Sequence, residues 1–285
     1  MEIKQTSASG SVPQHQIIIE PSRGWSSLGL EELWEYRELV FFTIKREIQG
    51  AYRQTALGAS WLFLRPIVST IILSLTFGLL VKVPSDGFPY PLFSLAALLP
   101  WGFFNQAVQR SANSLVQNMH IISKVYFPRL VVPLAGVLSG LVDFTASMIV
   151  FFVALLLYQM PLRVEMLTIP LFLLIAVIMA LGVGLWLATL SVKYRDVNFA
   201  VTFLLQALMY LSPVIYPISI VPEPLRFIYQ LNPMTGVIQG FRWALLGDLP
   251  PDWGIFMLSV LIAIAGMVSG AYIFRRTERT IVDLL

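Results

Sequence analysis

The apolar residues of this chain are gathered in long runs that short polar breaks separate. A helical run of about 20 apolar residues is long enough to cross about 30 Å of hydrocarbon. Each run is therefore predicted to form a membrane-spanning helix. The six predicted spans are residues 66–83, 92–108, 130–158, 166–190, 199–210 and 254–274.

Two further segments depart from this pattern. Residues 28–48 place apolar side chains near helical spacing beside a charged face, which is typical of an amphipathic helix at a membrane interface. After the fifth span come four closely spaced prolines: Pro213, Pro217, Pro222 and Pro224. Proline lacks the N–H donor that a regular helix needs, and irregular backbone at membrane depth must be buried in protein or line water. Residues 214–247 are therefore predicted to form re-entrant or extracytoplasmic helices.

These elements together predict an all-α membrane protein. It has six transmembrane helices, an N-terminal amphipathic interface helix and re-entrant extracytoplasmic helices before the last span. The predicted organisation is a flexible cytoplasmic tail at residues 1–24, the interface helix with a connector at residues 25–60, and a six-span domain at residues 61–285.

Composition and charge agree with this fold class. The chain is 57% hydrophobic and 12% charged, whereas soluble domains carry about 25% charged residues. Lys and Arg collect on the cytoplasmic side of membrane proteins, and the flanks of the spans hold twelve of them on one side against four on the other. Both termini are therefore predicted to be cytoplasmic, in a multi-pass protein of the cytoplasmic (inner) membrane.

Several kinds of chemistry lack their signatures. The chain has no cysteine and two histidines, so no metal site, thiol chemistry or cofactor is expected. Gly-x-x-x-x-Gly-Lys-Ser/Thr, the ATP-binding loop, does not occur, nor do the common zinc-hydrolase and serine-hydrolase motifs. The basic residues form no stripe with stacking aromatics, so nucleic acid is not an expected partner. The chain is predicted not to be an enzyme, and any ATP hydrolysis belongs to a separate subunit.

Asp143 is the one carboxylate deep in a predicted span. A charge at that depth costs at least about 2.5 kcal/mol on insertion scales. One interpretation is a gate or packing residue paired with a cation from another helix. The other is a position nearer the interface, with hydrogen bonds to neighbouring Ser or Thr.

Aromatic side chains gather in the segments assigned to the outer half of the membrane. One interpretation is a belt at the lipid headgroups; the other is a path whose rings stack on sugars. The candidate path residues are Phe88, Tyr90, Phe93, Trp101, Phe103, Phe104, Tyr210 and Tyr216.

Three pairs of glycines four residues apart begin at Gly136, Gly236 and Gly266. Such pairs let helices approach closely. Packing within the chain is the favoured interpretation, and a dedicated dimer face is the alternative.

A set of short motifs resembles one transporter family. The motifs occur in the same order as in that family, and the first of them is flanked by Arg46-Glu47, Trp61 and Pro66. They are residues 52–58 (YRQTALG), 123–128 (SKVYFP), 194–197 (YRDV), 212–217 (SPVIYP) and 231–234 (LNPM). The family is that of the ABC type 2 exporter permeases for O-antigen, capsular polysaccharide and teichoic acid. The resemblance covers about residues 35–245; the polar N-terminal tail is a departure from it.

The resemblance implies a transmembrane subunit that pairs with a second copy and with two ATP-binding subunits. Its expected function is ATP-driven export of a lipid-linked polysaccharide across the cytoplasmic membrane. It also implies that the loop between the second and third spans carries a helix that docks on the ATPase. The corresponding candidates here are Leu115, Met119, Ile122, Lys124, Tyr126 and Phe127.

Two alternatives stay open at this point. An ABC type 2 exporter of drugs or small lipids shares the fold. A membrane-embedded glycan-transferring enzyme would need several acidic residues grouped at one membrane face, whereas Glu165, Asp196 and Glu223 are scattered.

Overall fold

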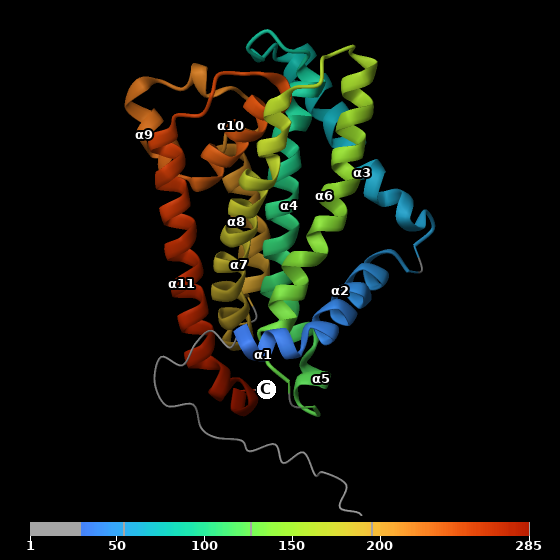
Figure 1. Ribbon diagram of the computed structural model, residues 1–285, viewed down its shortest axis with the longest axis vertical. Helices are drawn as coiled ribbons and strands as arrows, with labels where there is room; N and C mark the ends of the chain where they lie inside the picture. Colours follow the sequence, from blue (N-terminus) through green and yellow to red (C-terminus); the bar gives the residue numbers. More distant parts are fainter. Residues whose placement is uncertain (1–29, 54, 126, 195, 285) are drawn as a thin grey trace, which may run out of the picture.

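The computed structural model describes residues 30–53, 55–125, 127–194 and 196–284, and every regular element in this part of the chain is helical. The predicted tail at residues 1–24 lies outside the described residues. Figure 1 shows a bundle of long helices, with short helices at both ends. The helices are α1 (Leu30–Glu35), α2 (Arg37–Tyr52), α3 (Trp61–Leu73), α4 (Tyr90–Gln117), α5 (Met119–Ile122), α6 (Val131–Leu157), α7 (Ile169–Lys193), α8 (Val197–Leu211), α9 (Glu223–Leu231), α10 (Pro233–Leu246) and α11 (Trp253–Leu284).

Four stretches of the described residues are long and apolar enough to cross a membrane: Gly58–Leu80, Val131–Leu157, Val164–Lys193 and Trp253–Glu278. They contain α3, α6, α7 and most of α11. α8 is apolar but shorter, with 15 residues. The predicted all-helical membrane class is confirmed at this level, with four long apolar helices and one shorter one.

The helix α4 differs from its predicted extent. We expected a helix at residues 92–108 that fades into a polar stretch, but α4 continues unbroken through Pro100 to Gln117. The reason is that its buried face continues: Ala112 and Leu115 are fully buried beyond Val108. Figure 1 shows α4 running through the middle of the bundle, where it contacts α6, α7 and α10.

The first apolar helix also differs in its start. Pro66 was predicted to begin it, yet α3 begins at Trp61, after a 3-10 turn at Gly58–Ser60. The apolar run already starts at Trp61, so the helix can form before the proline. α3 then passes into a π-helical segment at Ser74–Leu80, where Gly78 faces the ring of Tyr90. An added Cβ at Gly78 would lie 2.9 Å from that ring, so this position needs a glycine.

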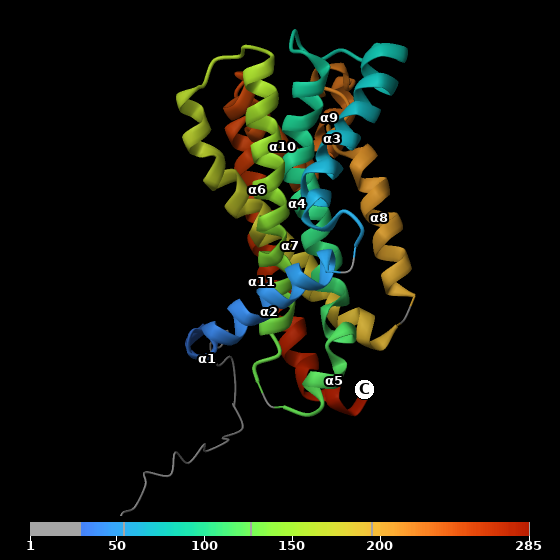
Figure 2. The same ribbon diagram turned by 90° about the vertical axis from the view of Figure 1, so that its right-hand side faces the viewer.

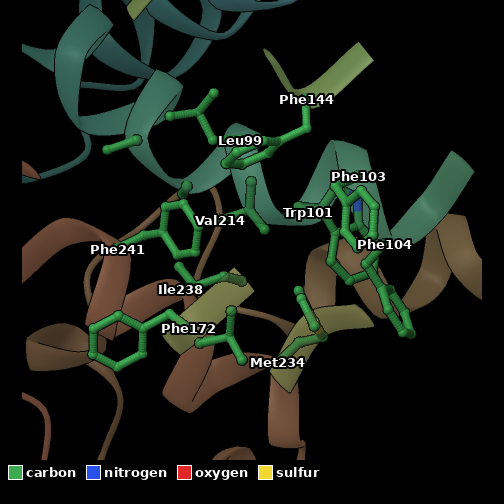
Figure 3. Close-up of a cluster of buried hydrophobic side chains, with 14 of the residues drawn as sticks. Leu99, Trp101, Phe103, Phe104, Phe144, Phe172, Val214, Met234, Ile238 and Phe241 are labelled. Atoms are coloured by element: carbon green, nitrogen blue, oxygen red, sulfur yellow. The ribbon is translucent and has the colours of Figure 1, made fainter. Parts of the chain in front are cut away.

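A row of aromatic rings binds α10 into the bundle (Figure 3). The ring of Phe144 on α6 meets Phe103 of α4 at 6.2 Å and Phe241 of α10 at 5.9 Å between centroids, both edge to face. Phe172 of α7 continues the row at 6.4 Å from Phe241. Edge-to-face pairs at this separation are favourable. The proline-broken region therefore packs on the core through α10.

In each of the three glycine pairs at least one glycine packs against another helix of the chain, in accord with the favoured interpretation. Gly136 lies against the backbone of Arg110 and Ser111 on α4, and Gly236 lies against Ser259 of α11. Gly270 of α11 meets the backbone of Gly182 on α7. Close helix approach at glycine replaces side-chain volume with backbone contact, which fixes the relative positions of α4, α6, α7 and α11.

Candidate functional site

One end of the bundle carries the predicted interface helix and the predicted coupling helix. Figures 1 and 2 place α1, α2, α5 and the end of α11 at this end, and α9 and α10 at the other. A separate hydrophobic cluster fills it, with Leu115, Ile122 and Phe127 packed near Phe274 of α11. Partly buried side chains of α1 and α2 cover this cluster, among them Leu33 and Val40.

The predicted coupling residues divide into buried and exposed ones. Leu115, Ile122 and Phe127 are buried, Met119 is half-buried and Lys124 is exposed. Tyr126 lies outside the described residues. Two exposed apolar side chains of this segment, Ile121 and Val125, were not among the predicted coupling residues. Their signal was present in the sequence, since Ile121 and Val125 are four residues apart, the spacing that places two side chains on one helix face.

Two side-chain contacts hold the ends of this segment. Arg46 of α2 donates to the side chain of Asn118, directly before α5. After α5, the guanidinium of Arg129 donates to the backbone carbonyl of Glu278 on α11. The Arg129 N–H also donates to Glu278 Oε1 at 3.3 Å. The short helix α5 is therefore tied to α2 on one side and to α11 on the other.

A second apolar face of the interface helix has no cover within the described chain. Trp34, Phe41 and Phe42 are 71%, 71% and 61% exposed. Trp34 lies on α1 and the two phenylalanines lie next to each other on α2, and Arg37 stands over the Trp34 ring, 5.6 Å from its centroid. This arrangement agrees with an amphipathic helix that lies in the membrane interface.

Asp143 is buried and paired with a cation from another helix, as one interpretation predicted. Its Oδ2 accepts from Arg110 of α4 at 2.7 Å. Arg110 also donates to Ser139 at 3.1 Å. The other oxygen of Asp143 accepts from the hydroxyl of Tyr52, at the end of α2.

Sequence reasoning assigned neither Arg110 nor Tyr52 to this network. Burial, followed by the hydrogen bond to Asp143, raises the pKa of Tyr52 to about 12. The phenol therefore stays protonated at neutral pH and remains a donor. The network joins the interface helix to α4 and α6.

The candidate path aromatics do not share one surface. Tyr90, Phe93, Trp101, Phe103 and Phe104 are all buried in the core of the chain. Phe88 and Tyr216 are half-buried, and Tyr210 is 53% exposed.

At the far end, side chains satisfy the irregular backbone of residues 212–217. Arg242 of α10 donates to the carbonyls of Val214 at 2.9 Å and Tyr216 at 3.3 Å. Tyr90 donates to the carbonyl between them, that of Ile215, at 2.7 Å. Each of three successive carbonyls thus has a side-chain donor, as buried backbone requires.

The guanidinium of Arg242 also lies over the Phe93 ring, 3.6 Å from its centroid. The two sequence motifs of this region meet in one hydrogen bond, from Asn232 Nδ2 to Ser212 Oγ at 2.8 Å. In the described residues no group of three or more acidic or histidine side chains could hold a metal ion.

Comparison with known proteins settles the family. The sequence model of the ABC-2 type transporter family matches residues 38–246, most of the chain. The chain belongs to this family. The predicted resemblance is thereby confirmed at family level, and the protein is a multi-pass membrane permease rather than an enzyme.

Named relatives share most of their length with this permease. The O-antigen export system permease protein RfbA of Myxococcus xanthus is 27% identical over 253 residues, covering 87% of this chain and 96% of the relative. The polysialic acid transport protein KpsM of Escherichia coli is 23% identical, covering 70% and 78%. The inner membrane transport permease YadH of Escherichia coli K12 is 24% identical, covering 65% and 76%.

Proposed function

We propose that this chain is the transmembrane subunit of an ATP-driven exporter that moves a lipid-linked polysaccharide across the cytoplasmic membrane. The observation that carries the proposal is the alignment with the O-antigen export permease, which extends over 253 residues and nearly the whole of that relative. A second relative whose name refers to a polysaccharide, the polysialic acid transport protein, supports the same class of cargo.

The proposed topology has six spans, formed by α3, α4, α6, α7, α8 and α11. Both termini lie in the cytoplasm, and α9 and α10 form re-entrant helices on the outer side. α4 is long enough to cross, at about 42 Å for 28 residues. The basic flanks at Lys193, Arg275 and Arg276 stand at the same end as α5, in accord with the positive-inside rule.

Energy enters this permease through α5 in the proposed mechanism. One ATP-binding subunit docks on the exposed side chains Ile121, Lys124 and Val125 of each copy of the chain. ATP binding favours one arrangement of the docked subunits over another, and a ligand shifts a conformational equilibrium by its difference in affinity. The ties of α5 to α2 and α11 transmit this shift to both helices.

A second copy of the chain completes the proposed exporter. α8 and α3 with its π-helical continuation at Ser74–Leu80 expose large apolar side chains, including Leu79, Phe199 and Phe203, and Figure 2 shows α8 at the edge of the bundle. These two helices are the proposed faces for the second copy. Among the candidate aromatics, Phe88, Tyr210 and Tyr216 remain available to the cargo, because the other five are held in the core.

Export of drugs or small lipids is the remaining alternative within the family, and the name of the YadH relative does not specify a cargo. A deletion strain of the source organism tests the choice. We expect deletion to leave the polysaccharide inside the cell and to abolish surface staining, with recovery on re-expression.

A pull-down of the tagged chain from mild detergent tests the architecture. A co-purifying ATPase in equal proportion, with vanadate-sensitive activity, is the expected result. Normal surface polysaccharide in the deletion strain, or a chain that purifies without any ATPase, would contradict the proposal.

A further inference from the structure

The central helix α4 carries a row of carboxamide side chains on its one open face. The residues that form this carboxamide stripe are Asn105, Gln106, Gln109 and Asn113, and all four are half-buried. Their spacing of one, three and four residues keeps them on one side of a helix with 3.6 residues per turn. The opposite side of α4, with Ala107, Ser111 and Leu115, is completely buried.

The stripe is level with the membrane in the proposed topology. Just before it, Phe103 packs on Gly140 of α6, and within it Ser111 packs on Gly184 of α7. Both glycines lie well inside the apolar stretches Val131–Leu157 and Val164–Lys193. An amide moved from water into hydrocarbon without a partner costs several kcal/mol. A stripe of four amides at this depth therefore has to face water or a polar ligand rather than lipid.

The carboxamides satisfy only part of their own hydrogen-bonding capacity. Gln109 Nε2 donates to Asn105 Oδ1 at 2.5 Å, and Asn113 donates to the carbonyl of Gln109 at 2.8 Å. Gln106 Oε1 accepts from both Arg65 and Arg110, each at 3.3 Å.

Within the described chain, Asn105 Nδ2, Gln106 Nε2, Gln109 Oε1 and Asn113 Oδ1 have no protein partner. The stripe thus offers neutral donors and acceptors along its length. One turn towards the outer side, Gly102 leaves open space where a side chain would stand.

We propose that the carboxamide stripe lines the hydrophilic path of the exporter and that its ligand is the polysaccharide. This inference rests on the proposed function. Sugar hydroxyls both donate and accept hydrogen bonds, as carboxamides do. Neutral amides also form weaker hydrogen bonds than charged groups do. They can therefore release one sugar and bind the next, which suits a polymer that has to move along the path. The aromatic residues earlier on α4 face the core, so the amides are the cargo-facing groups of this helix.

Labelling of single cysteines tests whether the stripe faces water, because the chain has no cysteine of its own. The variants Asn105→Cys and Gln109→Cys are compared with Val108→Cys on the buried face and Val153→Cys on the exposed apolar face of α6. The probe is a charged, membrane-impermeant methanethiosulfonate, applied to the exporter complex in lipid nanodiscs. We expect the stripe cysteines to react about ten-fold faster than either control, since buried thiols are inert.

Two labelling outcomes would overturn the proposal. The first is reaction of the stripe cysteines no faster than Val153→Cys, which would make the stripe a lipid face. The second is disulfide formation between Gln109→Cys residues of two copies together with loss of labelling, which would make it a closed contact between protomers. Neither result depends on the cargo, so neither bears on the proposed function.

Substitution at Gln109 tests the role of the stripe in export. Gln109→Leu and Gln109→Asn both shorten the side chain by one atom, but leucine removes the polar atoms whereas asparagine keeps the amide. We expect Gln109→Leu to lower surface polysaccharide several-fold with unchanged recovery of the ATPase, and Gln109→Asn to retain most export. Full export by Gln109→Leu would contradict recognition of the glycan by this residue. Loss of the ATPase from the unsubstituted chain would instead contradict the proposed function.

Discussion

At the scale of single residues, the buried charged side chains Asp143 and Arg242 bind side chains of other helices or backbone carbonyls. Asp143 binds Arg110 and Tyr52, so one carboxylate joins three helices. Arg242 has no carboxylate in contact among the described residues, and it donates instead to two backbone carbonyls. Both arrangements follow from the cost of leaving a charge or a carbonyl unpaired away from water.

Removing the charge of Asp143 tests the first arrangement. In Asp143→Asn the guanidinium of Arg110 loses its counter-charge, and we expect a loss of about 2 to 3 kcal/mol of stability. This is below the full cost of a broken buried pair, because Arg110 is partly exposed and keeps Ser139 and Gln106 as partners. Thermal unfolding in detergent measures it, with the exposed Glu35→Gln as the matched control. The double variant Asp143→Asn with Arg110→Gln should recover part of the loss, and no recovery would argue against coupling of the two charges.

The second arrangement predicts that Arg242 cannot be replaced by lysine. A lysine carries the charge but lacks the planar fork that reaches both Val214 and Tyr216. We expect Arg242→Lys to lower the unfolding temperature and the yield of folded protein markedly. Arg226 also donates to two carbonyls, those of Ser219 and Val221, but in a less buried place. Arg226→Lys should therefore have a small effect; an equal loss in both variants would contradict a special role of burial.

At the scale of elements, the sequence predicted the apolar helices well and the polar ones poorly. α6, α7 and α11 follow their apolar runs, because the length of an apolar helix has to match the thickness of the hydrocarbon core of the membrane. α4 extends beyond its predicted end. Polar residues such as Gln109 and Asn113 suggest a loop when they are read by composition, but in the structure they lie on one open face of the helix. The aromatics of α4 were assigned by residue type, which does not tell a ring that faces the core from one that faces a path. The partner of Asp143 was open for the same reason, since Arg110 and Tyr52 lie far from it in sequence.

The contact between α7 and α11 gives a prediction at this scale. A Cβ added at Gly182 would lie 2.6 Å from the backbone of Met267, and backbone on a packed helix cannot move aside cheaply. We expect Gly182→Ala to force α7 and α11 apart and to destabilise the bundle by about 1 to 3 kcal/mol, the usual cost of overpacking. Gly266, in the facing helix, has nothing within 4 Å of an added Cβ.

Gly266→Ala is therefore the matched control, and we expect it to keep the unfolding temperature of the unsubstituted chain. Chromatographic homogeneity and thermal unfolding in detergent compare the two variants. Equal stability of the pair would show that α7 and α11 are free to separate.

At the scale of the whole molecule, the two ends of the bundle have different constructions. At the end that carries α9 and α10, Arg242 and Tyr90 donate hydrogen bonds to the backbone of residues 214–216. The end with α5 is held by a separate apolar cluster and by contacts from α2 and α11. Because α2 also reaches Asp143 through Tyr52, movement of α5 has a continuous set of contacts into α4 and α6.

This construction predicts that a polar change on α5 weakens docking of the ATPase and lowers export without unfolding the bundle. Ile121 is 40% exposed at the tip of the molecule, so Ile121→Glu leaves the core intact but places a charge in the proposed apolar contact with the ATPase. We expect weaker recovery of the ATPase and a several-fold loss of export, at an unchanged unfolding temperature.

The matched control is Leu249→Glu, which makes the same kind of change at an exposed apolar residue of the opposite end. It should leave ATPase binding intact, because the proposed docking surface is confined to the end that carries α5. If Ile121→Glu bound the ATPase as well as Leu249→Glu does, α5 would not be the docking element, and the exposed apolar face of α1 and α2 would be the next surface to substitute.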